Sequence, residues 1–209
     1  MLFATLWQRA PLAQAQTLMF DIIILLIMLL FVLILLFVIF SAFLGYLITK
    51  VPFVPTSAED ISFIVQKLTI GKNQIFYDLG SGNGKVCFLV HKLCGAKCVG
   101  FELTWWTHLW AKIKKRCLQF SPLLRGDAQR AERLLFKNQD FFKANWREAD
   151  FIYGYLFPFL MVRVEEKFLQ EGKAGSIAII RDFRFPNLKP TETFYLPKKH
   201  EIYIYKKQV

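Results

Sequence analysis

The chain has 209 residues, of which 55% are hydrophobic, and its 27 basic and 16 acidic residues give a formal net charge of +11. Outside one long apolar run, the remaining ~160 residues suffice for a single domain with a buried core. The four cysteines show no paired framework, which excludes a disulfide scaffold and favours a reducing compartment.

Residues 22–40 form an unbroken apolar run, which continues with small interruptions to Ile48. A helix needs ~20 apolar residues to cross a bilayer core, whereas the apolar core of a signal peptide has only about 7–15. We therefore expect a transmembrane anchor over residues 21–49, which enters the membrane through Ile22–Ile48. Residues 1–20 are then a short N-terminal tail.

The charges beside this run predict its orientation. Arg9 and Asp21 precede it, whereas Lys50, Lys67 and Lys72 follow it. Because basic residues concentrate on the inner side, residues 50–209 are expected to face the cytoplasm, or a matrix-like compartment, as the domain of a single-pass protein.

The whole formal charge lies in residues 50–209, because Arg9 and Asp21 cancel. A basic domain next to a membrane is attracted to anionic lipid headgroups. Nucleic acid or a merely solvated lysine-rich surface would also account for the charge. No RNA-binding motif is present, so we expect the membrane and its anionic headgroups as partners and no nucleic acid.

The domain is expected to begin with an extended connector over residues 51–57, because its two prolines push the preceding residues out of helical geometry. Thr56 and Glu59 predict a capping box for the next helix. The apolar face of this helix comprises Ile61, Ile64, Val65 and Leu68, and Gly71 ends it.

A glycine-rich loop, Asp78-Leu79-Gly80-Ser81-Gly82-Asn83-Gly84, follows the first predicted strand, Gln74–Leu79, and precedes a helix over about Lys85–Leu93. Alternating glycines at a strand-to-helix junction let the backbone approach a ligand closely. The third glycine comes one position too early for the dinucleotide fingerprint. The spacing resembles motif I of class I S-adenosylmethionine (SAM) methyltransferases.

A second predicted strand, Lys97–Phe101, ends at Glu102. In a doubly wound sheet, a carboxylate at this strand end faces the ribose hydroxyls of a nucleoside that lies across the first loop. The separation from the glycine loop is close to the ~20 residues expected. The loop and Glu102 together predict a nucleoside site, whereas a plain tight turn with a solvated glutamate is the alternative.

The remaining segments alternate between helix and strand. They comprise a helix with a basic side over Trp105–Gln119, strands at Leu134–Asn138, Phe151–Tyr155 and Ser176–Arg181, a helix from Pro158 to Gln170, and a hairpin of Thr193–Leu196 and Glu201–Tyr205. This order predicts an α/β fold with a mainly parallel, Rossmann-like sheet and an antiparallel edge. His91, Cys94 and Cys98 lack a fourth ligand, so we expect packed thiols and no metal site.

From Val51 to about Tyr205, the chain resembles the small membrane-associated class I methyltransferases. These include the mitochondrial lysine methyltransferases that act on the c subunits of ATP synthase and on adenine nucleotide translocase. The resemblance rests on V-P-x-V-P-T at residues 51–56, the loop at 78–84, Gly100-Phe101-Glu102-Leu103 followed by Trp106, Asp140-Phe141, Pro158, and residues 181–186. It implies the class I methyltransferase fold and SAM as the cofactor.

The resemblance also implies roles for individual residues. Asp78 and the loop residues Gly80, Ser81, Gly82 and Gly84 would surround the aminocarboxypropyl part of SAM, with Asp78 at its amino group. Glu102 would accept from the ribose, and Asp140 would contact the adenine. Pro52 and Thr56 would lie over the cofactor or the substrate entry.

The chemistry adds candidates for the acceptor side. Methyl transfer to an amine requires alignment near ~3–3.5 Å and a deprotonated nucleophile. A lysine with its ordinary pKa of ≈ 10.4 is mostly protonated at neutral pH, and an apolar slot would lower that pKa because it disfavours the charged form. Tyr153, Tyr155, Phe157 and Pro158 form such a slot, or else they face lipid or pack in the core. Tyr155 and Pro158 are therefore the candidate catalytic residues.

Neither D-P-P-Y nor N-P-P-Y occurs at the end of the fourth predicted strand, which disfavours methyl transfer to the nitrogen of a conjugated amide or to an exocyclic nitrogen of a base. Thr104-Trp105 and Phe159 replace the family's usual Asn-Pro and Gln, at the rim where the substrate enters. We expect a membrane-anchored, SAM-dependent methyltransferase that acts on lysine side chains of a membrane or membrane-associated protein. A methyltransferase of lipids or small amphiphiles and a non-catalytic SAM-binding scaffold are the alternatives.

Overall fold

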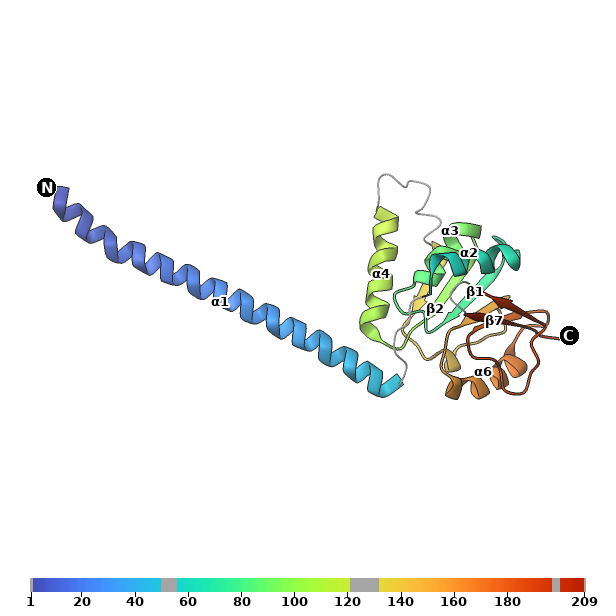
Figure 1. The fold of residues 1–209 in the computed structure, drawn as a ribbon. Coiled ribbons are helices and arrows are strands. Elements are labelled where there is room, and N and C mark those ends of the chain that lie inside the picture. Colours follow the sequence, from blue (N-terminus) through green and yellow to red (C-terminus); the bar gives the residue numbers. More distant parts are fainter. Residues whose placement is uncertain (1, 50–55, 121–131, 197–199, 209) are drawn as a thin grey trace. The chain divides into compact units, whose positions relative to one another are not determined.

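The computed structural model describes residues 2–49, 56–120, 132–196 and 200–208. The chain divides into two compact units, Met1–Lys50 and Val51–Val209. The first unit contains the single helix α1 (Leu2–Thr49), and the second contains a sheet with helices on both faces (Figure 1).

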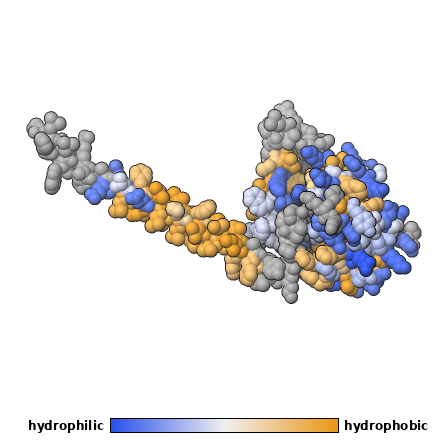
Figure 2. Space-filling model, viewed as in Figure 1, coloured by the Kyte–Doolittle hydropathy of each residue, from blue (hydrophilic) through white to orange (hydrophobic). Residues whose placement is uncertain are grey.

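Helix α1 contains a stretch, Gln16–Ser41, whose 26 residues are long and apolar enough to cross a membrane, judged by length and composition. At ~1.5 Å per residue the stretch is about 39 Å long, which exceeds the ~30 Å of a bilayer core. Most of its surface is hydrophobic in Figure 2, apart from hydrophilic patches near its start. The helix also includes residues 2–20, so the expected N-terminal tail is helical where it is described.

The second unit contains one sheet of seven strands in the order β3-β2-β1-β4-β5-β7-β6. The strands are β1 (Ile75–Leu79), β2 (Lys97–Phe101), β3 (Leu134–Lys137), β4 (Phe151–Gly154), β5 (Ile177–Arg181), β6 (Glu192–Tyr195) and β7 (Glu201–Lys206). Strands β1 to β5 pair in parallel, and β7 pairs antiparallel with β5 and β6. The predicted mainly parallel sheet with an antiparallel edge is confirmed. The carboxyl ends of β1, β2, β4 and β5 and the start of β7 lie along the same edge of the sheet.

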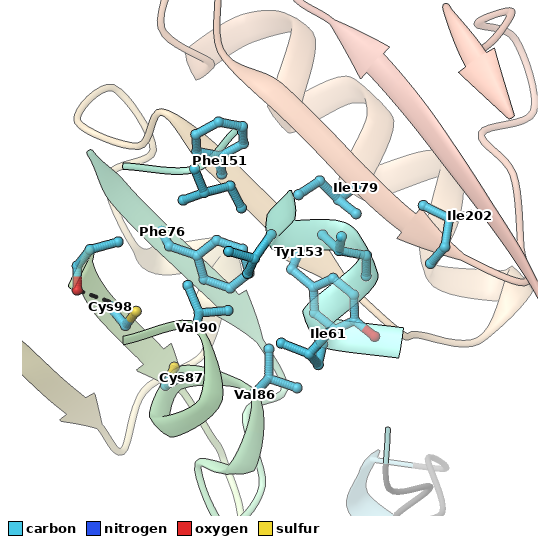
Figure 3. Packing of buried hydrophobic residues seen from close by; sticks show 14 of the residues in the cluster. Ile61, Phe76, Val86, Cys87, Val90, Cys98, Phe151, Tyr153, Ile179 and Ile202 are labelled. Carbon is cyan, nitrogen blue, oxygen red and sulfur yellow. Dashed lines mark hydrogen bonds between the residues drawn. The ribbon is translucent and has the colours of Figure 1, made fainter. Parts of the chain in front are cut away.

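Helices cover both faces because strand side chains alternate between them. Phe76, Phe151 and Tyr153 pack with α2 (Ala58–Lys67) and α3 (Lys85–Cys94), as Figure 3 shows. Ala111 of α4 (Trp105–Phe120) joins the same core. On the opposite face, Ile152 packs with α6 (Pro158–Glu171) and with the 3₁₀ helix η2 (Phe141–Lys143).

The start of α2 differs from the predicted capping box. Ser57 is the N-cap, and its Oγ accepts a hydrogen bond of 3.1 Å from the backbone N–H of Asp60. Thr56 is buried, and its hydroxyl lies 3.0 Å from the hydroxyl of Tyr153. The predicted capping box at Thr56 is therefore wrong, because the Thr56 hydroxyl is hydrogen-bonded to Tyr153 of strand β4 instead.

Candidate functional site

The glycine loop between β1 and α3 is fixed to the end of strand β2. The carbonyl of Phe101 accepts hydrogen bonds from the backbone N–H groups of Gly80, at 3.0 Å, and Ser81, at 2.8 Å. Gly80, Gly82 and Gly84 have φ values of +77°, +53° and +77°. Such left-handed conformations are strained for most other residues, so the glycines permit a turn that lies tightly against β2.

Two close approaches explain why the loop and β2 both require glycine. A Cβ on Gly84 would lie 2.5 Å from the ring of Phe136. A Cβ on Gly100 would lie 2.6 Å from Oγ of Ser81. The loop therefore packs directly on β2 and β3 and forms a cradle that a larger side chain would distort.

Glu102 joins the loop to the start of α4. Its Oε2 accepts a hydrogen bond of 2.7 Å from the N–H of Gly82, and its Oε1 accepts one of 2.8 Å from the N–H of Thr104. The side-chain amide of Asn138 donates to the carbonyl of Glu102 at 2.8 Å. Each carboxylate oxygen has two acceptor positions, so the side chain keeps capacity for the hydroxyls of a ligand.

Asp78 lies at the end of β1 and is only 2% exposed. Burial, with a smaller contribution from the Glu102 carboxylate, raises its pKa to about 7, although the Cys87 thiol donates a 3.7 Å hydrogen bond to Oδ2. Within the described part of the chain, no basic side chain forms an ion pair with Asp78. A cationic ligand group nearby would stabilise the ionised carboxylate.

The other predicted site residues lie near the same edge of the sheet or outside the described residues. Asp140 follows β3 and caps η2, with its Oδ1 accepting a 2.9 Å hydrogen bond from the N–H of Phe142. Pro158 is exposed and starts α6, while Tyr155 is half-buried after β4. Pro52 lies outside the described residues.

The predicted aromatic slot needs one correction. Tyr153 is a buried core residue, and burial raises the pKa of its hydroxyl, which lies against Thr56. Its ring packs in the core together with residues of α2 and α3. Phe157 lies at the edge instead, with its ring centroid 6.2 Å from that of Phe183.

A buried ion pair beside this edge was missed by sequence reasoning. Nη1 of Arg181, at the end of β5, lies 2.7 Å from Oδ2 of Asp60 on α2, and their side chains are only 3% and 5% exposed. The guanidinium also lies over the ring of Tyr155, 4.7 Å from its centroid. The pair connects α2 with strands β4 and β5.

Asp182 follows Arg181 and has an uncommon backbone conformation, with φ of +61°. Its Oδ2 lies 2.9 Å from Nδ1 of His200, and its Oδ1 accepts a 3.0 Å hydrogen bond from the N–H of Glu201. Since a carboxylate can only accept, Nδ1 carries the hydrogen and the neutral imidazole has its acceptor at Nε2. The charged residues Arg181 and Asp182, which end the apolar sequence of β5, were the available signal for this cluster. His200 precedes β7, and only the tertiary structure brings it beside Asp182.

Comparison with known proteins gives a consistent picture. The family model of the ANTKMT methyltransferase domain matches residues 78–192. A lysine N-methyltransferase of the ATP synthase c-subunit from Rattus norvegicus is 24% identical over 143 residues, which cover 68% of this chain and 61% of the relative. An adenine nucleotide translocase lysine N-methyltransferase of Mus musculus is 26% identical over 145 residues, which cover 68% and 57%. The chain thus spans about three fifths of the length of these curated relatives.

Solved structures show the fold. An RNA methyltransferase of Salinibacter ruber in complex with S-adenosyl-L-homocysteine matches with a TM-score of 0.65 and 22% identity, covering 74% of this chain and 94% of that one. A putative SAM-dependent methyltransferase of Methanococcus maripaludis matches with a TM-score of 0.56 and 13% identity, covering 81% and 92%. The predicted class I methyltransferase fold is confirmed.

Proposed function

Because this chain belongs to the family of the ANTKMT methyltransferase domain, we propose that it is a membrane-anchored, SAM-dependent methyltransferase of protein lysine side chains. The observation that carries the proposal is the glycine loop hydrogen-bonded to the Glu102 carboxylate. Both curated relatives are lysine N-methyltransferases of proteins. We propose the same acceptor group, a lysine side chain, for this chain, but we do not propose that it methylates the particular substrates of these relatives.

The residues of the loop edge fit SAM. When bound, SAM supplies an electrophilic methyl group on a sulfonium. Gly80, Gly82 and Gly84 have no side chains, so the aminocarboxypropyl chain of SAM can approach the loop backbone closely. Asp78 offers a buried carboxyl to its ammonium, and Glu102 offers two carboxylate oxygens to its ribose hydroxyls. We assign Asp140 to the adenine side, and Thr56 and Pro52 to the cofactor cover, as further proposals.

The ends of β4 and β5 would receive the acceptor amine. Tyr155 and Pro158 border this position, and Phe157 and Phe183 add an apolar wall. An amine must lose a proton before it can accept a methyl group. The Asp182 carboxylate attracts an arriving ammonium, and the acceptor nitrogen of His200 offers a place for its proton. Apolar surroundings favour the neutral amine.

The membrane assignment rests on α1 and on charge. Gln16–Ser41 is long enough to span a bilayer. We propose a single pass with Val51–Val209 on the cytoplasmic or matrix-like side, because Lys50, Lys67 and Lys72 follow the span. Such an anchor would keep the catalytic unit at the surface where a membrane-protein substrate presents its lysines.

The test is a transfer assay with the purified full chain, methyl-labelled SAM and membranes from the source cells. We expect label in protein, recovered as methyl-lysine after hydrolysis, and loss of that label when lysines are acetylated beforehand. Label in the lipid extract would replace the lysine assignment with a lipid acceptor. SAM binding without any transfer would identify a scaffold.

Two glutamate variants make the assay specific. Glu102→Ala removes the acceptor of the Gly82 N–H and should weaken SAM binding by about 10–100-fold, since hydrogen bonds to charged groups are worth roughly 1.5–3 kcal/mol. Glu166→Ala removes an exposed glutamate of α6 and should change neither binding nor transfer. Equal behaviour of the two variants would contradict the cofactor site.

A further inference from the structure

Helix α4 exposes apolar side chains on the face opposite the core. Thr107, His108 and Ala111 are buried, and Ala111 belongs to the core of the sheet. Large side chains lie on the other face, and we call them the α4 stripe: Trp105, Leu109, Trp110 and Ile113, which are 51%, 46%, 55% and 42% exposed. Figure 2 shows hydrophobic surface over part of this helix. The outer face of a helix in a water-soluble domain is normally polar, so the stripe is an unusual feature.

Basic residues border the stripe. At about 100° per residue, Lys112 falls on one side of the stripe, Lys114 falls on the other, and Arg116 lies within it. All three side chains are exposed. The helix sequence, WWTHLWAKIKKRCLQF, contains no aspartate or glutamate. Tryptophan and aliphatic side chains on one face with lysine at its borders are typical of helices that lie in the plane of a bilayer surface.

A second helix of the same unit provides a contrast. Helix α6 also exposes apolar side chains, Val162 and Leu169, but its sequence, PFLMVRVEEKFLQE, includes three glutamates. The glutamates of α6 offset its Arg163 and Lys167, so an anionic surface would attract α4, which has basic residues and no acidic ones, more strongly than α6. The difference in charge, more than the exposed apolar area, distinguishes the two faces.

We propose that the α4 stripe is a docking surface for an anionic lipid bilayer, on which α4 lies parallel to the membrane plane. This inference rests on the membrane anchor of the proposed function. The net charge of +11 favours an anionic surface, and the apolar stretch in α1 supplies a reason for a bilayer to be near. A bilayer is favoured over a protein partner because the stripe combines interfacial tryptophans with lysines on both borders.

The stripe adjoins the candidate cofactor site. Trp110 and Lys114 line a hollow of about 330 Å³ together with Asn83 of the glycine loop, Trp106 and Thr107. A bilayer at the stripe would therefore lie next to the loop that we assign to SAM. The contact would also hold the sheet edge with its acceptor residues at a fixed orientation to the membrane surface.

The test compares two leucines with the same exposure. Leu109 and Leu169 are both 46% exposed, on α4 and α6 respectively. The full chain carries the photo-crosslinker p-benzoylphenylalanine at one position or the other. It is reconstituted into vesicles of phosphatidylcholine, with or without phosphatidylglycerol, floated and irradiated. Mass spectrometry then measures the yield of phospholipid adducts, and binding of S-adenosylhomocysteine verifies that each variant is folded.

We expect lipid adducts at position 109 in several-fold excess over position 169, with a yield that rises with phosphatidylglycerol and falls with salt. Lys112→Glu should lower the yield at 109 by roughly fivefold or more, since each basic residue near an anionic surface is worth ≈ 1 kcal/mol. Equal yields at the two positions would overturn the α4 contact. Adducts between position 109 and a protein in native membranes would overturn it in favour of a protein partner.

The anchor and the stripe fail in different ways. A chain that stays out of the floated vesicle fraction would overturn the anchor and with it the proposed membrane enzyme. A chain that floats but gives equal lipid yields at 109 and 169 would overturn the stripe alone.

Discussion

At the scale of single residues, Asp78 combines a cost to the stability of the fold with the role in SAM binding that we propose for it. Burial raises its pKa to about 7 from an ordinary value of 3.8. Between these pH values the folded chain holds a proton that the unfolded chain has released. Stability therefore falls as pH rises from about 4 to about 7, and the whole difference corresponds to about 4 kcal/mol.

We predict that Asp78→Asn stabilises the chain at pH 8 by up to about 4 kcal/mol and leaves it almost unchanged at pH 4, because the amide has no proton to lose. The same variant should bind SAM at least tenfold more weakly, since it loses the negative charge. Thermal unfolding in detergent at several pH values and calorimetry with SAM measure the two effects. A gain in stability that is independent of pH would contradict the raised pKa.

Gly100 permits the glycine loop to lie on β2. A methyl group there would lie 2.6 Å from Oγ of Ser81 and 3.0 Å from the ring of Phe136. We predict that Gly100→Ala destabilises the chain by about 1–3 kcal/mol and weakens SAM binding, because the loop must move. Denaturant titration and calorimetry provide the readouts.

The matched control is Gly71→Ala, whose new methyl group would lie 3.7 Å from Oε1 of Gln74, an ordinary contact. It should change stability by less than about 1 kcal/mol. If the two alanine variants were equally stable and bound SAM equally well, the loop would not depend on close packing at Gly100.

At the scale of elements, α2 is joined to the sheet by the ion pair between Asp60 and Arg181. The pair resembles the Lys173–Asp150 pair in length, at 2.7 Å against 2.6 Å, but the first is buried and Lys173 is 51% exposed. Burial decides the energetic difference, because removing Asp60 leaves the guanidinium of Arg181 shielded from water, with the longer 3.7 Å contact to Asp182 as its remaining ion pair.

Asp60→Ala should therefore destabilise the chain by about 3–5 kcal/mol, whereas Lys173→Ala should cost less than about 1 kcal/mol. Urea unfolding of the two variants measures the difference. Similar losses in both would indicate that water reaches Arg181 and that α2 is held mainly by its apolar face.

At the scale of the whole molecule, the division into two units predicts that residues 51–209 fold independently of α1. Removal of residues 1–50 should leave the melting temperature and the affinity for S-adenosylhomocysteine almost unchanged, because residues 51–209 form their own compact unit. Methylation of membranes should fall by at least tenfold, since the tether no longer raises the local concentration of enzyme.

Replacing α1 by an unrelated transmembrane helix is the control, and it should restore methylation if α1 acts only as a tether. A truncated chain that methylates membranes as fast as the full chain would contradict the role of the anchor.

Several features could be predicted from the sequence because they depend on local patterns. The alternating strands and helices predicted the parallel sheet, and the glycine spacing predicted the loop after β1. Glu102 lies beside Gly82 as expected, because adjacent parallel strands bring their carboxyl ends to one edge. The apolar span of α1 was visible because a long apolar run is a property of neighbouring residues.

Other features arise only from long-range packing. The N-cap moved from Thr56 to Ser57, because Thr56 pairs with Tyr153 across 97 positions of sequence. His200 reaches Asp182 because β7 pairs antiparallel with β5. The α4 stripe could not be identified from the sequence, because only the structure shows which face of that helix is buried in the core.

The sequence by itself determined the fold class, the glycine loop after β1 and the apolar span, since each is a property of neighbouring residues and their spacing. The tertiary structure decided which polar groups meet at the ends of β4 and β5 and which apolar side chains stay exposed. Those outcomes depend on strand pairing and on packing between distant segments, which no local pattern specifies.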